Sequence, residues 1–366
     1  MDRHVAGSWL QKIALLLVSV AVSNSCITQK GIYVEGSLLG YPVAAAVDHK
    51  LAAAMITNRQ DSSVVKFFEE YGNIQPDNEV LASITKKYSL NVATLFFIEK
   101  LYSQEKNRRL QDYYLSVIDT LSPQHLAQQL LFLQSVYVVF IPAFNYESNI
   151  GNFSQQRELF DAAKVPYEMV NVQPWGSVED NAEIVAKQLR KINGQHPNVI
   201  AISASKGGLE TAIALGKILN PGELSSVKAW INVCGILKGS PAADYWAVPV
   251  RKWWLSCGLF FAGMRMDLSA LLRSLSYEQR RQEVQELAIP GSIYTVNFIA
   301  ANLHLKKDRI NMAVPNDGYS PLLDEIAAGG DVVVELGPGH TLEGVDLNIR
   351  MVTLLRYVVN QLTINN

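Results

Sequence analysis

From residue 135 to the C-terminus, apolar strand-like segments alternate with helix-like ones, and this pattern limits the fold more than any other feature. Six short segments rich in Val, Ile, Phe and Tyr are typical of strands buried on both faces: VYVVFIPAF (136–144), YEMVNV (167–172), NVIAISAS (198–205), KAWINVCGIL (228–237), SIYTVNFIA (292–300) and DVVVEL (331–336). Helical periodicity lies between them, at 154–163, 178–192, 207–219 and 320–329. We therefore predict an α/β fold with a doubly wound parallel sheet flanked by helices.

The turn after the third of these segments carries the pattern Ser203-x-Ser205-x-Gly207. A nucleophilic serine in a strand-to-helix turn has a strained backbone, so the residues two before and two after it must be small. The following helix N-terminus would place partial positive charge near Ser205, where it favours an oxyanion. An ordinary connection rich in Ser and Gly has the same composition, so this motif alone leaves both interpretations open.

A nucleophilic serine needs a histidine to accept its proton. In this fold class the order along the chain is serine, acid, histidine, and only His304 and His340 follow Ser205. His340 comes after DVVVEL and a Gly-Pro-Gly loop, which would place it at the carboxyl edge of the sheet. We favour His340 over His304, which lies before the best acid; the structural alternative for His340 is a turn residue that caps a helix.

The favoured acid is Asp317, in the turn Asn316-Asp317-Gly318. The interval from Asp317 to His340 has room for one helix and one strand. Asp-Gly turns are common, so the order of the residues carries the choice rather than the turn itself. The competing acids are Asp308, Asp324 and Asp331.

The motifs Ser203-x-Ser205-x-Gly207 and Asn316-Asp317-Gly318, followed by His340 after the last strand, resemble the α/β-hydrolase superfamily. Within it, the Asn-Asp-Gly turn is similar to that of bacterial secreted lipases and esterases. The resemblance covers the chain from about residue 135 onward, and the sheet begins with VYVVFIPAF where those lipases also begin. It implies a serine hydrolase that cleaves carboxylic esters through an acyl-enzyme.

The resemblance also implies two backbone donors for the oxyanion. One is the N–H of Lys206, and the other comes from the loop after the first strand. Where the family usually has His-Gly, this chain has Pro142-Ala143-Phe144, and matching by position indicates Phe144. For the side chain of Lys206 we expect a solvated position, although it lies beside the serine and would attract anionic substrates.

A segment at about 238–290 is too long for a single crossover helix, and the resemblance implies that an insertion here forms a helical cap over the serine. It contains seven large apolar residues: Trp246, Trp253, Trp254, Phe260, Phe261, Met264 and Met266. Such residues would suit an acyl chain, because each buried methylene contributes about 0.8 kcal/mol. The alternative is that they form the cap's own core.

The segment 26–134 is predicted to be helical. PVAAAVDHKLAAAMI begins with Pro42 at a first helical position, and five further stretches have apolar residues at three- and four-residue spacing. The segment offers no chemistry, so we expect it to serve packing or to contact an unknown protein partner. We place the hydrolase domain at 135–366.

The N-terminus indicates export. Lys12 precedes an apolar run at 13–22, and small polar residues follow at 23–25. A helix of that length rises only about 15 Å, so it matches a secretory signal peptide (1–25) rather than a membrane span. Cys26 resembles the lipidated cysteine of a bacterial lipoprotein, although residues 23–25 depart from the usual lipobox. We expect location in the bacterial cell envelope, anchored by a lipid such as palmitate on Cys26, or secretion; an incidental cysteine is the alternative.

Composition removes several classes of function. The chain has 32 basic and 34 acidic residues, which leaves no surplus to neutralise phosphates, so we expect no nucleic-acid partner. No His, Cys and Asp cluster has metal-ligand spacing, and we expect no metal and no cofactor. The expected substrate is a small-molecule or lipid ester. Two alternatives stay open: a catalytically silent binding module of the same fold, and a thioesterase or amidase.

Overall fold

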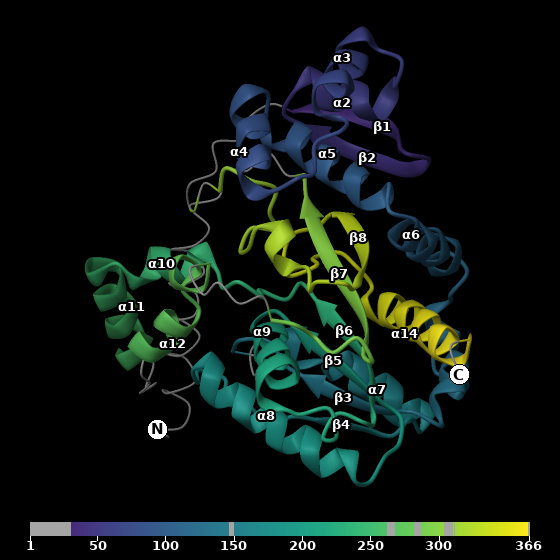
Figure 1. Ribbon diagram of the computed structural model, residues 1–366, viewed down its shortest axis with the longest axis vertical. Coiled ribbons are helices and arrows are strands. Elements are labelled where there is room, and N and C mark those ends of the chain that lie inside the picture. The colour runs from purple at the N-terminus through teal and green to yellow at the C-terminus, as the bar shows by residue number, and fades with distance from the viewer. Residues whose placement is uncertain are drawn as a thin grey trace, which may run out of the picture.

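The computed structural model describes residues 31–145, 150–261, 268–281, 287–303, 310 and 312–364. Its centre is a six-stranded sheet in the order β4-β3-β5-β6-β7-β8, with every neighbouring pair parallel (Figure 1). The strands are β3 (Tyr137–Ile141), β4 (Tyr167–Met169), β5 (Val199–Ala204), β6 (Val227–Val233), β7 (Tyr294–Asn302) and β8 (Asp331–Gly337). Each overlaps one of the six predicted segments, so the predicted doubly wound parallel sheet is confirmed.

Helices cover both faces of this sheet. They are α7 (Ser154–Ala163), α8 (Val178–Asn193), α9 (Lys206–Ile213) with its π-helical continuation (Ala214–Ile218), and α14 (Leu347–Ile364). Phe140 and Ile202 face the core with α7 and α14, whereas Val139 and Ala201 face the core with α8 and α9. Consecutive strand residues thus enter two different cores, which is why these strands are apolar throughout.

The N-terminal part is helical from residue 50 onward and packs on the sheet. Its helices are α2 (Lys50–Thr57), α3 (Ser62–Tyr71), α4 (Asn78–Lys87), α5 (Leu90–Tyr102) and α6 (Glu105–Ile118), followed by 3-10 turns at Pro123–His125 and Gln128–Leu133. The apolar residues of α2 to α5 share a core with Ile299 and Ala301 of β7 and with Val332 and Val334 of β8. This segment therefore covers the part of the sheet that α8 and α9 leave open.

The prediction of a helix from Pro42 is wrong. Residues 32–47 form an antiparallel hairpin of β1 (Ile32–Leu38) and β2 (Tyr41–Val47), in which Pro42 pairs with Ser37. Both turn residues have positive φ, 53° at Leu39 and 93° at Gly40, as the type I′ turn of a two-residue hairpin requires. Packing overrides the helical preference of the Ala-rich sequence here.

One glycine shows how closely the hairpin packs. A Cβ on Gly36 would lie 2.5 Å from the carbonyl oxygen of Ile56, so the strand backbone rests directly on α2. The helix itself begins only at Lys50, where the ring nitrogen Nδ1 of His49 accepts the N–H of Leu51 at 3.0 Å.

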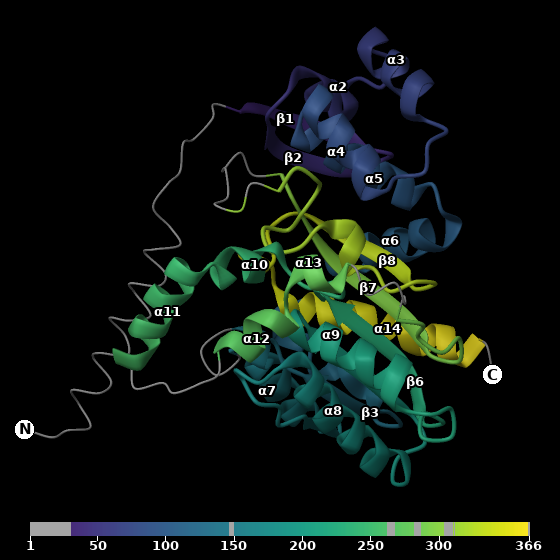
Figure 2. The ribbon, with the colours of Figure 1, turned by 60° about the vertical axis from the view of Figure 1, so that its left-hand side comes forward.

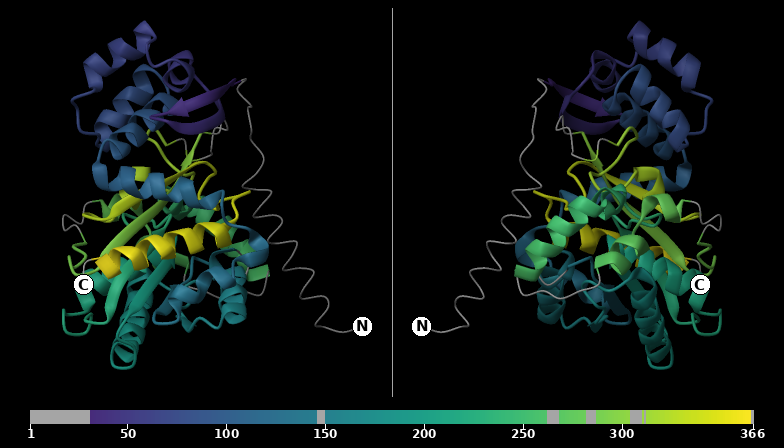
Figure 3. Two further views of the ribbon diagram at one scale, coloured as in Figure 1. Left: turned by 90° about the vertical axis from the view of Figure 1, so that its right-hand side faces the viewer. Right: turned by 90° about the vertical axis from the view of Figure 1, so that its left-hand side faces the viewer.

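Helix α6 lies along the outer edge of β8 and beside α14, as the blue and yellow helices show in Figure 3. Asn107 accepts the N–H of Val332 at 2.8 Å, and Gln111 both accepts the N–H of Val334 at 3.0 Å and donates to its carbonyl at 3.3 Å. Side-chain amides thereby satisfy the backbone groups that an edge strand would otherwise leave unpaired.

The predicted cap is present between β6 and β7. It contains α10 (Pro241–Ala247), α11 (Pro249–Phe261), α12 (Leu268–Ser274) and α13 (Tyr277–Arg280), with α11 projecting away from the sheet (Figure 2). The helix expected at 320–329 is only a 3-10 turn, Leu322–Glu325. Within the described part of the chain, no helix combines the length and the apolar character needed to cross a membrane.

Candidate functional site

Ser205 occupies a strained turn between β5 and α9. Its backbone has φ 53° and ψ −120°, a conformation that side-chain-bearing residues rarely adopt. A Cβ on Gly207 would lie 2.5 Å from the carbonyl oxygen of Pro142, so no larger residue fits there. Ser203 is fully buried, and its Oγ accepts the indole N–H of Trp230 at 2.8 Å. The two small residues of the motif thus have separate reasons to be small.

The structure brings Ser205, His340 and Asp317 into one hydrogen-bonded row. Nε2 of His340 lies 2.8 Å from Oγ of Ser205, and Nδ1 of the same ring contacts Oδ2 of Asp317. The row crosses from the end of β5 to the loops after β7 and β8, which meet at the carboxyl edge of the sheet. A backbone hydrogen bond also connects the two loops, because the N–H of His340 donates to the carbonyl of Asp317 at 2.8 Å.

Asp317 is fully buried yet well supplied with donors. Its Oδ1 accepts the N–H groups of Tyr319 and Ser320, both at 2.9 Å, while Oδ2 faces His340. Burial alone would raise the pKa of Asp317, but the charge and hydrogen bond of His340 and the two backbone donors lower it below its ordinary value. The carboxylate is therefore ionised at neutral pH and holds the ring in place.

The competing acids have other partners or lie outside the described residues. Asp324 accepts from the hydroxyl of Tyr277 at 2.7 Å and lies 3.1 Å from Nζ of Lys238. Asp331 accepts from the hydroxyl of Tyr294. Asp308 and His304 belong to the residues that the structure does not describe, as do Cys26 and the predicted signal peptide.

Lys206 is the first residue of α9, so its N–H has no acceptor four residues earlier in the helix and points toward the serine end. The carbonyl of Ser205 is held by the N–H groups of Gly208 at 2.9 Å and Ile236 at 3.2 Å, which fixes this turn. Phe144, the other predicted donor, lines the same cavity as Ser205, and its ring is edge-on to Trp175 at 4.7 Å between centroids. The structure thus brings both predicted donors to the serine end of the sheet.

Ser205 and His340 line an apolar cavity of about 380 Å³. From the cap, Trp246 and Leu255 contribute to its wall. Most of the lining is apolar; it includes Phe153, Trp175, Val233, Ile236, Leu268, Leu271, Leu272, Leu275, Leu342 and Met351. An acyl chain placed here would leave water, which is the favourable direction for apolar groups.

The predicted aromatic lining is only partly correct. Trp253 and Trp254 project into solvent, with 59% and 65% of their surface exposed, so they belong neither to the lining nor to the cap's core. The side chains of Phe260 and Phe261, and both Met264 and Met266, lie outside the described residues.

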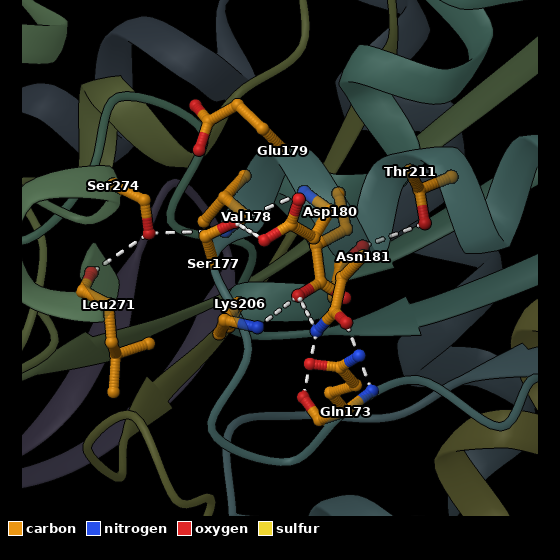
Figure 4. Close-up of polar contacts among 12 residues, drawn as sticks. Gln173, Ser177, Val178, Glu179, Asp180, Asn181, Lys206, Thr211, Leu271 and Ser274 are labelled. Atoms are coloured by element: carbon orange, nitrogen blue, oxygen red, sulfur yellow. Dashed lines mark hydrogen bonds and ion pairs between the residues drawn. The ribbon is translucent and has the colours of Figure 1, made fainter. Parts of the chain in front are cut away.

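The expectation of a solvated Lys206 side chain is wrong. The side chain is 2% exposed and forms an ion pair with Glu210, one turn further along α9. Figure 4 shows the Lys206 side chain extending toward Asn181 and Gln173. The amide of Asn181 on α8 donates to the same carboxylate at 2.8 Å and also to the carbonyl of Gln173 at 2.9 Å. A lysine followed four residues later by a glutamate is the spacing that signals such a pair in a helix.

This buried network joins three elements behind the serine. Burial raises the pKa of Glu210 to about 6 against the attraction of Lys206. One oxygen of Glu210 has no hydrogen-bond partner among the described residues. Because α8, α9 and the loop at 173–177 meet here, the network fixes the start of α9 and hence the turn that carries Ser205.

Comparisons with known proteins give structural but no sequence relatives: no protein-family model and no curated protein matches the chain. The metagenomic carboxyl esterase MGS0156 is 19% identical with a TM-score of 0.46, over 62% of this chain and 76% of that one. Mature Bacillus licheniformis lipase BlEst2 is 16% identical with a TM-score of 0.44, over 63% and 92%. Mouse alpha/beta hydrolase domain-containing protein 10 is 16% identical with a TM-score of 0.37, over 62% and 90%.

The chain's own geometry is α/β-hydrolase-like. A parallel sheet is flanked by helices on both faces, a helical cap follows β6, and the strained turn after β5 carries Ser205. The predicted fold class is confirmed, with the hairpin at 32–47 as the departure from the all-helical N-terminal segment.

Proposed function

We propose that this protein is a serine hydrolase that cleaves carboxylic esters through an acyl-enzyme. One observation carries the proposal: Oγ of Ser205 lies 2.8 Å from Nε2 of His340, in a strained turn at the wall of an apolar cavity. A serine hydroxyl and an imidazole at this distance form the pair that nucleophilic catalysis requires. The ionised carboxylate of Asp317 completes the row.

In the first half of the reaction, Oγ of Ser205 attacks the ester carbonyl while its proton moves to Nε2 of His340. For this, the neutral ring must carry its hydrogen on Nδ1, and that is the nitrogen that faces Asp317. The N–H of Lys206, and in our proposal that of Phe144, bind the oxyanion. The imidazolium then protonates the departing alcohol, which leaves the acyl group on Ser205.

In the second half, water takes the place of the alcohol. His340 removes a proton from the water, the hydroxide attacks the acyl carbon, and the proton returns to Ser205 as the acid leaves. The apolar cavity favours substrates with an acyl chain, and lipid-derived esters are the class that fits it.

The direct test is labelling with a fluorophosphonate, which reacts with activated serines. The folded protein should be labelled, and Ser205→Ala should not. Absence of labelling, or equal labelling of Ser205→Ala, would mean a catalytically silent module. Rates over a series of ester chain lengths, with matched thioesters and amides, then identify the leaving group; no preference for longer acyl groups would contradict a lipase.

We further propose that the protein acts in the cell envelope, tethered by a lipid on Cys26. The proposal is supported by the apolar run at 13–22 and by the cysteine that follows the small residues at 23–25. Labelled palmitate should enter the full-length protein expressed in a bacterium and be absent from Cys26→Ala. Equal incorporation in both would contradict the tether, and secretion of unlabelled protein would support export alone.

A further inference from the structure

Glu325 is a fully buried acid close to the row of Ser205, His340 and Asp317. It ends the 3-10 turn Leu322–Glu325, and its side chain is 0% exposed. Neither carboxyl oxygen has a hydrogen-bond partner in the part of the chain that the structure describes. An ionised carboxylate in that position would be very costly, because nothing replaces its lost hydration.

Two titratable groups, Asp317 and Cys234, lie close to Glu325. One oxygen of Glu325, one oxygen of Asp317 and Sγ of Cys234 all lie within 4.8 Å of one another. Two ionised carboxylates are both acceptors only, so they cannot bond to each other. A single proton on one of them would supply the donor that a hydrogen bond between them requires.

The donors around the pair decide which acid holds the proton. Asp317 receives the N–H groups of Tyr319 and Ser320 and contacts His340, all of which favour its charged form. Glu325 receives no such donor. Burial first, and then the negative charges of Asp317 and Asp324, raise the pKa of Glu325 well above its ordinary value.

We propose that Glu325 is a positioning residue that stays protonated and donates its O–H to Asp317, thereby tuning how strongly Asp317 attracts the protonated ring of His340. The inference rests on the proposed serine hydrolysis and deepens it. Glu325 does not line the cavity, and its carboxyl group has no hydrogen bond to Ser205, so it would act only through Asp317.

The other charged groups near Glu325 leave this assignment intact. Asp324 lies next to it in the chain, but its carboxylate is held by Lys238 and Tyr277. The thiol of Cys234 keeps its proton, because burial and the neighbouring carboxyl groups raise its pKa well above the ordinary value. One ligand atom each of Cys234, Asp317 and Glu325 also lie close enough together to hold a metal ion, but such an ion would compete with His340 for Asp317.

The direction in which a substitution of Glu325 moves the acid limb of the kcat/KM profile depends on whether Glu325 is neutral or charged. A neutral donor draws negative charge away from Asp317 and so weakens its hold on the imidazolium. Removing the donor in Glu325→Leu should then move the acid limb of kcat/KM to higher pH by about one unit, which is about tenfold less activity at pH values below the limb. Glu325→Gln keeps a neutral donor and should leave the limb in place.

The experiment compares the pH profiles of the wild type, Glu325→Gln and Glu325→Leu, with Asp324→Asn as a matched control from the same turn. The control should leave the limb in place. A limb that moves to lower pH in Glu325→Gln would show that a negative charge was removed, and the proposal would be wrong. A Glu325→Leu profile identical to the wild type would equally overturn it.

Infrared spectroscopy gives a second measurement that needs no activity. The wild type at neutral pH should show the carbonyl stretch of a protonated carboxylic acid that is absent from Glu325→Gln and unaffected by added metal chelator. Its absence from the wild type would overturn the proposal even if Glu325→Leu fails to fold. If the wild type shows the band but hydrolyses no ester, the proposed function fails while the buried protonated acid remains.

Discussion

Two buried acids lie on different sides of Ser205, and their carboxyl groups have contrasting surroundings. Asp317 lies on the side of β7 and β8, and its oxygens face two backbone N–H groups and His340. Glu210 lies on the side of α8 and α9, pairs with Lys206 and leaves one oxygen without a partner. The pKa of Asp317 is lowered, whereas burial raises the pKa of Glu210 to about 6.

The difference shows that burial alone does not decide which carboxyl group is charged and able to orient His340. Asp317 receives hydrogen bonds that favour its charge, and its imidazole partner, His340, reaches the serine. Glu210 faces a fixed lysine on its own helix and an amide on the next, so its charge serves to hold helices together. The first arrangement suits proton transfer, and the second suits support of the serine turn.

The largest expected effect is the loss of activity on substitution of Ser205, which His340 links to Asp317. Ser205→Ala should lower kcat for ester hydrolysis by about 10⁶-fold, because the proposed acyl-enzyme forms on its Oγ. Steady-state kinetics with a chromogenic ester measures this. The matched control is Ser203→Ala in the same turn, whose hydroxyl only accepts from Trp230. It should stay active, and an inactive but folded Ser203→Ala would place the chemistry elsewhere.

The second effect tests whether Asp317 acts by orienting the ring. Asp317→Asn should lower kcat by about 10⁴-fold, because an amide that donates to Nδ1 favours the tautomer with its hydrogen on Nε2. The same ester assay measures it, with circular dichroism to check the fold. A variant that keeps more than a tenth of wild-type kcat would mean that another acid orients His340.

The sequence was sufficient for the sheet and for the row of Ser205, Asp317 and His340. Buried parallel strands leave a continuous apolar signal, and the order serine, acid, histidine leaves few candidates. The hairpin at 32–47 could not be predicted in the same way, because its Ala-rich second strand favours a helix and its pairing depends on contact with α2.

Glu325 and Glu210 show a further limit of the sequence. Both appear as charged residues in helix-like segments, where a solvated position is the usual outcome. Their burial results from elements distant in the chain: α8 brings Asn181 to Glu210, and the end of β6 brings Cys234 to Glu325. Only the assembled fold shows that these acids are buried.

The third prediction concerns the stability of the Glu210 side. Glu210→Gln should lower the free energy of unfolding by about 3–5 kcal/mol, because it leaves the charge of Lys206 buried without a counter-ion. The double variant Lys206→Met with Glu210→Leu should recover most of this loss, since the buried pair itself contributes little net stability. Denaturant unfolding measures both. A double variant as unstable as the single one would mean that the ion pair is itself a major source of stability.

The smallest effect is the pH dependence of that pair. The folded pKa of Glu210, about 6, lies above its ordinary value of 4.5, so its contribution to stability is complete below pH 4.5 and is lost as the pH rises through 6. That loss is about 2 kcal/mol, at 1.36 kcal/mol per pH unit. Relative to the double variant, which has no titrating pair, the unfolding free energy of the wild type should therefore fall by this amount between pH 4.5 and 7.5. Asp317 contributes a pH dependence of the opposite sign, because its lowered pKa stabilises the fold above its unfolded pKa. Both proteins retain Asp317, so its contribution cancels from the difference in unfolding free energy. A difference that stays constant with pH would mean that Glu210 is ionised throughout, and the two acids would then differ in their partners but not in their charge.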